Sequence, residues 1–145
     1  MKRISPLALS LALCLSGAGP ATASTARLEL SSNGHYMTEA MIDGASILVM
    51  VDTGASSVAL SYEDAQRVGV RESDLSFNAP VSTANGTVNA APVMIRRITI
   101  GGVSVEDVSA MVLPPGAMSG SLLGMSFLSR LDSYEVRQGV LILRD

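Results

Sequence analysis

A single carboxylate, that of Asp52, stands where an apolar run meets a run of small residues. Residues 47–51 are aliphatic and partly β-branched, which predicts a buried strand, and residues 58–60 predict a second short strand. The small residues 53–57 suit a tight loop between them. A carboxylate at the end of a core strand is costly to bury unless it is paired or hydrogen-bonded. Asp52 is therefore a candidate for acid–base chemistry. The competing interpretation is a turn former bonded to N–H groups two residues on.

A second segment combines two apolar residues with a glycine. Leu122 and Leu123 predict a short core strand, and Gly124 follows them directly. Apolar residues between 127 and 131 recur at helical spacing, which predicts a short amphipathic helix. By itself, the segment is also compatible with an ordinary strand, turn and helix of the core.

A hairpin of small and polar residues is predicted between residues 79 and 91. Its turn contains Ala84, Asn85 and Gly86, and Asn-Gly is a strong signal for a tight turn. Because the flanking residues are small and polar, both faces of the hairpin can be solvated. By itself, this pattern fits an ordinary surface hairpin.

The string Val-Asp-Thr-Gly-Ala-Ser at residues 51–56 resembles the active-site loop of the aspartic peptidases. It occurs once in a short chain, as in the retropepsin-like branch, in which one chain supplies half of a two-fold site. The apolar-apolar-Gly triplet at 122–124 and the helix after it resemble the segment that crosses beside the catalytic loop in these enzymes. The two motifs in this order are more specific than the Asp triplet alone. Over residues 35–143 the chain is similar to bacterial single-domain retropepsin-like proteases.

The resemblance implies an aspartic endopeptidase that cleaves protein or peptide substrates as a homodimer. Asp52 would meet its symmetry mate across a two-fold axis, and the pair would share one proton and activate a water molecule. Thr53 would lock the two loops together, and the Gly54 N–H would bind the carboxylate. Ala55 and Ser56 would support the loop. This chemistry needs no metal, no other cofactor and no covalent intermediate.

The same resemblance gives roles to the other two segments. Ala84, Asn85 and Gly86 would belong to a flap over the substrate, with Asn85 and Gly86 at its tip. Residues 122–124 would pack beside the loop of Asp52, and Gly124 would let the backbone approach that loop closely. One alternative is a non-catalytic periplasmic peptide-binding or assembly module with the same fold. Another is an unrelated β-sandwich in which the Asp triplet is a plain turn.

The elements that would position these residues are short strands separated by frequent turns. Turn signals at Asp43-Gly44 and at residues 137–139 predict hairpins, and residues 61–69 predict one clear helix with Ser61 as its N-cap. This pattern indicates an all-β barrel or sandwich. The resemblance narrows it to a retropepsin-like closed β-barrel with one or two short helices and one lobe per chain, whose terminal strands would form the dimer interface. Strands are predicted over 26–30, 35–42, 46–51, 92–100, 103–108 and 110–113.

Composition limits both the chemistry and the partners. The 145 residues fit one domain, and because 48% are hydrophobic but only 3% aromatic, the core must be aliphatic. With Cys14 and His35 as the only cysteine and histidine, zinc-ligand clusters and Ser-His or Cys-His nucleophile arrangements are excluded, unless His35 acts alone. The net charge is −3 and no long basic run is present, so a nucleic acid is not an expected partner.

Residues 1–23 are predicted to be a secretory signal peptide. Lys2 and Arg3 form a positive n-region, an apolar h-region follows, and the small residues before Ser24 form a cleavage site. The h-region is shorter than the ~20 residues that span a bilayer. Cleavage after Ala23 would leave a domain of residues 24–145 in the periplasm or outside the cell, without stable membrane insertion. An uncleaved N-terminal membrane anchor is the alternative.

Overall fold

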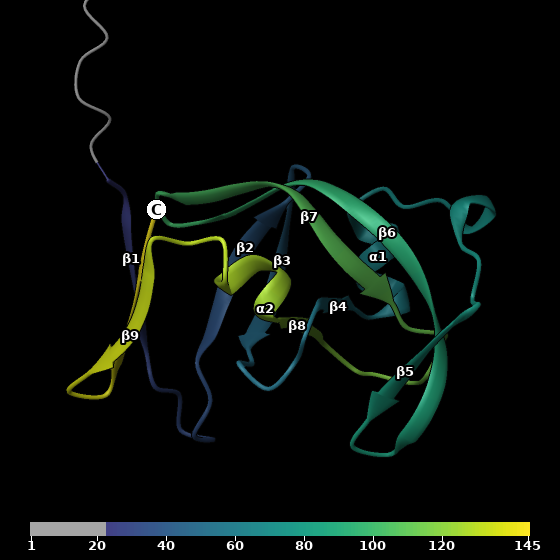
Figure 1. Ribbon diagram of the computed structural model, residues 1–145, viewed down its shortest axis with the longest axis horizontal. Helices are drawn as coiled ribbons and strands as arrows, with labels where there is room; N and C mark the ends of the chain where they lie inside the picture. Colours follow the sequence, from purple (N-terminus) through teal and green to yellow (C-terminus); the bar gives the residue numbers. More distant parts are fainter. Residues whose placement is uncertain (1–22) are drawn as a thin grey trace, which may run out of the picture.

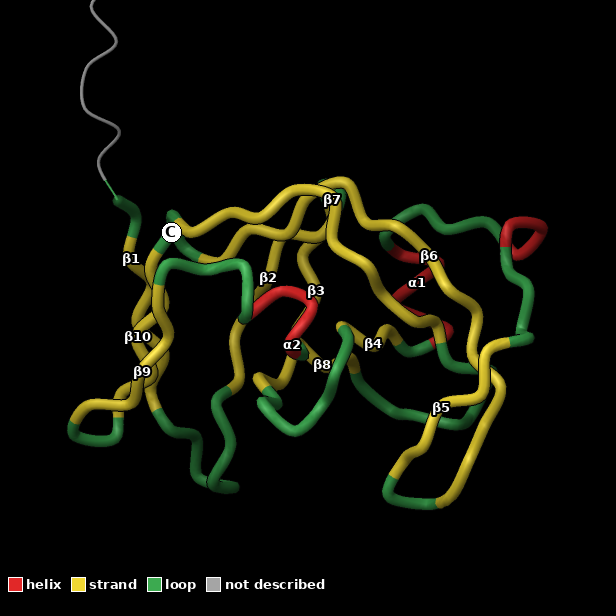
Figure 2. The backbone as a smooth tube through the Cα atoms, viewed as in Figure 1, coloured by secondary structure: helices red, strands yellow, loops and turns green. Residues whose placement is uncertain are grey.

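Six strands close into a barrel in the computed structural model, which describes residues 23–145 (Figures 1 and 2). They are β2 (Met37–Ile42), β3 (Ala45–Val51), β4 (Val58–Leu60), β6 (Gly86–Ile100), β7 (Val103–Val112) and β8 (Ser121–Leu123). The order around the barrel is β2-β3-β8-β4-β7-β6, and β6 pairs back with β2, which closes the sheet. The predicted all-β fold and closed barrel are therefore confirmed, and the sandwich is excluded.

Smaller elements surround the barrel. A short strand, β5 (Ala79–Thr83), pairs only with β6. A separate sheet has the order β1-β10-β9. Its strands are β1 (Thr25–Glu29), β9 (Ser133–Arg137) and β10 (Val140–Arg144). The helical elements of the described residues are α1 (Tyr62–Arg67), the 3-10 turn η1 (Glu72–Asp74) and α2 (Met125–Leu128). The expected signal peptide lies, except for its last residue, outside the described residues. Between residues 23 and 145, no helix is both long and apolar enough to cross a membrane.

The position of β8 determines the path of the loop that carries Asp52. β8 lies between β3 and β4, parallel to β3 and antiparallel to β4. These two neighbours are consecutive along the chain, so the loop of residues 52–57 that joins them must cross over the end of β8. The register places Leu123 beside Val51, at the same end of the barrel as Asp52. The sequence motifs at 51–56 and 122–124 thus meet in space.

The strand β6 is continuous over 15 residues and contains Pro92. The sequence predicted a separate strand that starts at Pro92, and this prediction was wrong. β5 pairs with residues 86–90 and β2 with residues 98–99, so at Pro92 the only neighbour of β6 is β7. A proline, which has no N–H, is tolerated where one edge of a strand is unpaired. The β5–β6 hairpin therefore extends directly from the barrel wall (Figure 1).

Aliphatic side chains fill the barrel, as the composition required. Alternate residues of the strands point inward, and each large apolar side chain that is fully buried contributes roughly 1.5–3 kcal/mol to stability. The helices α1 and α2 both pack against this core. Ser61 caps the N-terminus of α1, as predicted, because its hydroxyl accepts the Asp64 N–H at 3.1 Å. The largest fully buried side chains are Phe127, Ile42, Ile47, Leu60, Ile95, Ile98, Ile100, Leu123, Leu128, Leu143, Val49 and Val58.

The three-stranded sheet brings the two ends of the described chain together. Ala26 and Leu28 of β1 pair with Leu143 and Leu141 of β10, and all four side chains are buried in the common core. The turn between β9 and β10 has positive φ angles at residues 138–139, which agrees with the predicted hairpin. The alternating apolar residues near the two ends of the described chain therefore belong to strands that pair in one sheet within the same protomer.

Candidate active site

Asp52 is the first residue after β3, at the end of the barrel where its loop crosses over β8. Its backbone N–H donates to the Leu123 carbonyl at 3.1 Å, and its Oδ1 accepts the Gly54 N–H at 2.9 Å. Asp52 is half-buried, whereas Thr53 and Gly54 are exposed at the tip of the loop. The bond to Gly54 is typical of a turn-forming Asp. It also orients the carboxylate while using only one of its two oxygens, so acid–base chemistry remains open to the group.

The rest of the loop lies against the start of α2, where a side chain would not fit. Ala55 accepts the Met125 N–H on its carbonyl at 2.8 Å, which fastens the loop to the helix. A Cβ on Gly124 would lie 2.2 Å from the Ser57 carbonyl oxygen and 2.7 Å from that of Ala55. Real Cβ atoms do not approach other atoms so closely. The close backbone approach expected of Gly124 is therefore present.

Ser126 is a structural partner of this site that sequence reasoning missed. Its hydroxyl accepts the Val58 N–H at 2.8 Å and donates to the Ser109 carbonyl at 2.7 Å. One side chain of α2 thus binds the start of β4 and the wall strand β7 together. A serine inside a short helix gave no local signal for this role, because its partners are distant along the chain.

Leu122 and Leu123 point to opposite sides of β8. Leu123 is fully buried, whereas Leu122 is partly exposed. The register places Leu122 between Met50 and Ala59, which are also partly exposed. Cross-strand partners share a face of the sheet. A small apolar surface therefore lies at the level of Met50, two residues before Asp52, on three adjacent strands.

The predicted flap is an exposed hairpin that hydrogen-bonds to itself. Thr83 pairs with Gly86 across the turn, and Ala84 and Asn85 form the two-residue loop. The Thr83 hydroxyl donates to the Gly86 carbonyl at 2.8 Å and accepts the Asn85 N–H at 3.2 Å. Gly86 thus begins β6 and is not part of the tip itself. Among the hydrogen bonds of residues 23–145, none joins this turn to the loop of Asp52.

The two best-formed hollows of the described residues lie away from Asp52. They have volumes of about 360 and 410 Å³, and neither includes the loop of residues 52–57. The part of the chain that the structure describes has no group of three or more His, Cys, Asp or Glu residues that could hold a metal ion. His35 lies exposed in a turn region.

Comparison with known sequences identifies the family. A model of the family described as "gag-polyprotein putative aspartyl protease" matches residues 38–130, a stretch that contains both Asp52 and Gly124. An uncharacterized protein in the cobV 5′ region of Sinorhizobium sp. is 47% identical over 118 residues, which cover 81% of this chain and 51% of that protein. The chain spans about half the length of the curated relatives it matches.

Solved structures extend the comparison to the fold. The crystal structure of a retropepsin-like aspartic protease from Rickettsia conorii is 33% identical and superimposes with a TM-score of 0.75, covering 84% of this chain and 91% of that chain. EIAV protease in complex with the inhibitor HBY-793 shares the fold with a TM-score of 0.58, at 19% identity over 71% of this chain and 93% of that chain. By its sequence and its fold, the chain belongs to the retropepsin-like family of aspartyl proteases.

Proposed function

We propose that this protein is an aspartic endopeptidase that acts as a homodimer, with the Asp52 carboxylates of two protomers at the two-fold axis. The observation that carries the proposal is the anchored carboxylate. Asp52 is held through the Leu123 carbonyl and the Gly54 N–H on a loop that Gly124 allows to close against α2. Hydrolysis of this kind uses a pair of carboxylates, and one protomer offers one, so a second copy completes the site.

The pair would work by acid–base catalysis on a water molecule. Two carboxylates about 3 Å apart cannot both be ionised, so the pair shares one proton. The bound water attacks the peptide carbonyl carbon while the ionised Asp52 takes a proton from it. The protonated Asp52 of the other protomer donates its proton to the carbonyl oxygen. The amine leaves once it has been protonated. The Thr53 hydroxyls of the two loop tips would bond across the axis and fix the pair.

The free edge of β9 supports association with a second copy. Among the described strands, β9 pairs only with β10, and its apolar side chains Tyr134 and Val136 are 38% and 58% exposed. An unpaired apolar edge strand favours pairing with another chain. The Tyr134 hydroxyl lies 3.8 Å from Met125 Sδ, and the Met125 N–H binds the Ala55 carbonyl. The edge is therefore connected to the catalytic loop through only two contacts.

The surfaces near Asp52 suit an extended peptide with apolar side chains. The partly exposed Met50, Ala59 and Leu122 are all aliphatic or small, and the β5–β6 hairpin can cover a bound segment as a flap. We assign the protein to the periplasm or the extracellular space, after cleavage of the signal peptide following Ala23. N-terminal sequencing of the purified protein tests this assignment, because an uncleaved anchor would leave Met1 or the following residues in place.

The test of the catalytic proposal is the cleavage of an unstructured protein such as casein from acidic to neutral pH. We expect the wild type to cleave it, and Asp52→Asn to lose roughly 10²- to 10⁴-fold in rate. The asparagine Oδ1 can still accept the Gly54 N–H, so the fold should persist. Asp132→Asn, an exposed Asp outside the site, is the matched control. Full activity in Asp52→Asn would refute the proposal. Peptide binding without cleavage by the wild type would favour the non-catalytic binding module.

The dimer is tested separately by sedimentation. Val136→Arg puts a charge on the free edge of β9 and should weaken self-association, with activity falling steeply on dilution. Met94→Arg is the control, because Met94 is similarly exposed, at 62%, but lies on the barrel wall in β6. A wild-type protein that is fully active as a monomer would contradict the two-fold site.

A further inference from the structure

Three polar residues are buried among those that the structure describes, and hydrogen bonds that involve side chains and backbone N–H groups link all three. Ser61, Asp64 and Ser121 are 2%, 7% and 2% exposed. Together they form a cluster, the Ser61–Asp64–Ser121 cluster, where the end of β4 and the start of α1 meet the first residue of β8. Burial of a carboxylate is costly, and replacing buried ionic groups by apolar ones is often neutral or stabilising. The cluster therefore calls for an explanation beyond stability alone.

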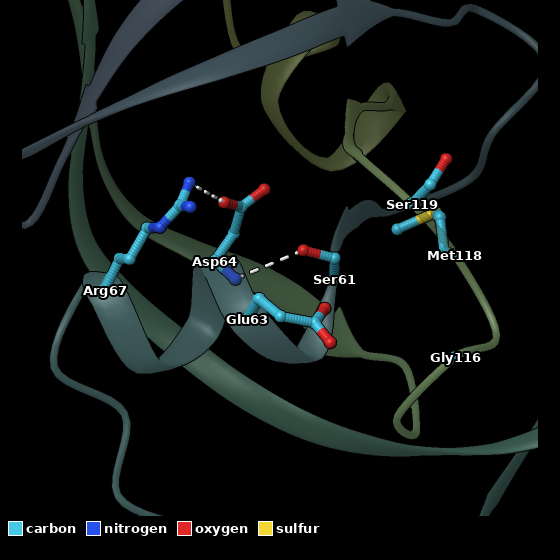
Figure 3. Close-up of a pocket in the computed structure, with 7 residues that line it drawn as sticks. All are labelled: Ser61, Glu63, Asp64, Arg67, Gly116, Met118 and Ser119. Atoms are coloured by element: carbon cyan, nitrogen blue, oxygen red, sulfur yellow. Dashed lines mark hydrogen bonds and ion pairs between the residues drawn. The ribbon is translucent and has the colours of Figure 1, made fainter.

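Every polar atom of the cluster has a directed partner. The Ser121 hydroxyl donates to Asp64 Oδ2 at 2.7 Å and accepts the Ser61 N–H at 3.1 Å. The Ser61 hydroxyl accepts the Asp64 N–H at 3.1 Å. Arg67 Nη1 lies 3.1 Å from Asp64 Oδ1 and closes the remaining side of the carboxylate (Figure 3). The hydroxyl of Ser121 is thus held in a single orientation by one donor and one acceptor.

The cluster joins elements that are fixed in different ways. Ser61 directly follows β4, and Asp64 lies in the first turn of α1, so these two move as one unit. Ser121 is the first residue of β8, a strand of only three residues that pairs with β4 at a single position. On its other side, β8 pairs with β3 at all three of its residues. Because so short a strand has few ladder hydrogen bonds, the contact with Asp64 adds a further restraint on its position along the barrel.

The position of β8 along the barrel affects Asp52, because the Asp52 backbone is hydrogen-bonded to this strand. Leu123, two residues after Ser121, offers the carbonyl to which the Asp52 N–H donates, and Gly124 follows at the close contact with the loop. A displacement of β8 along its axis would move both contacts together. A hollow of about 360 Å³ borders Asp64, Arg67 and Ser119, and its lining does not include Asp52 (Figure 3).

We propose that Asp64 is a positioning residue for catalysis: through its bond to Ser121 it fixes the axial position of β8 and thereby the orientation of the Asp52 loop. The proposal rests on the proposed function of Asp52 but adds a residue outside the family motif. Asp64 acts through Ser121 and Leu123 and does not itself contact the substrate.

The test compares Asp64→Ala and Ser121→Ala with Asp64→Asn, which keeps an acceptor oxygen for the Ser121 hydroxyl. Val103→Ala is the control, because it removes fully buried apolar atoms from the first residue of β7, which is not part of the cluster. The first readout is amide hydrogen exchange of Asp52, which needs no activity. We expect exchange about tenfold faster in the two alanine variants, and near the wild-type rate in Asp64→Asn and Val103→Ala.

The second readout is catalysis well below the melting temperature of each variant. Asp64→Ala and Ser121→Ala should lower kcat by roughly 10- to 100-fold with KM nearly unchanged, and the double variant should lose no more than the worse single one, because both changes break the same bond. Val103→Ala should keep its kcat. Unchanged exchange at Asp52 in both alanine variants would overturn the positioning role. Faster Asp52 exchange in the two alanine variants, combined with a wild-type protein that cleaves no substrate, would support the structural link between Asp64 and the Asp52 loop. The same result would reject the proposed function.

Discussion

Gly124→Ala tests the fit between the Asp52 loop and α2 more directly than any other substitution. A Cβ at this position would lie 2.2 Å from Ser57 O, 2.6 Å from Ser57 C and 2.7 Å from Ala55 O. All three are backbone atoms, so no side-chain rotation relieves the contact. The loop or the start of α2 must therefore move by roughly 1 Å to reach normal contact distances.

This movement acts on the hydrogen bonds that hold Asp52. The Met125 N–H donates to the Ala55 carbonyl at 2.8 Å, and the Asp52 N–H donates to the Leu123 carbonyl at 3.1 Å. We expect Gly124→Ala to lower the free energy of unfolding by about 3 kcal/mol, which corresponds to a fall of ~10 °C in Tm for a domain of this size. Because the carboxylate moves with the loop, kcat should fall roughly 100-fold.

The assays are calorimetric unfolding and peptide cleavage, with Gly120→Ala as the matched control. A Cβ on Gly120 meets nothing within 4 Å, so this variant should stay within about 0.5 kcal/mol of the wild type. If Gly124→Ala melts and cleaves like Gly120→Ala, the argument that only glycine fits beside the loop is wrong.

Three further predictions concern the contacts around the site and the chain ends. Ser126→Ala leaves the buried Val58 N–H without its partner and should lower the free energy of unfolding by roughly 1–3 kcal/mol in urea titrations; no change would mean that the N–H finds another acceptor. Thr83→Val removes the hydroxyl that bridges the hairpin turn, and it should raise KM while Tm stays unchanged, in contrast to a purely structural hairpin, for which KM would not move. The Ser104 N–H, as the largest cause, holds the pKa of Asp145 below its usual value. A carboxylate whose pKa is depressed by folding stabilises the fold above its unfolded pKa, and this stabilisation is lost as pH falls through the folded pKa. Asp145→Asn should therefore lose less stability than the wild type on acidification below about pH 4, and equal pH slopes in thermal unfolding would contradict this.

The sequence by itself determined the local elements, because their signals act between residues close along the chain. Asp43 and Gly44 adopt positive φ angles in the turn between β2 and β3, as the dipeptide predicts. Ser61 caps α1 through the N–H three residues on. The resemblance carried by residues 51–56 and 122–124 further gave the family and the closed barrel. The catalytic role of Asp52, the flap and the dimer stay predictions.

Only the tertiary structure decided how these elements combine. Pro92 reads as the start of a strand, yet it lies within β6, because the loss of one neighbouring strand there removes the need for its N–H. The bond between Ser121 and Asp64 spans 57 residues, and that between Val58 and Ser126 spans 68. A hydroxyl has no preferred partner at such separations. The insertion of β8 between β3 and β4 creates these contacts, and no local pattern encodes that insertion.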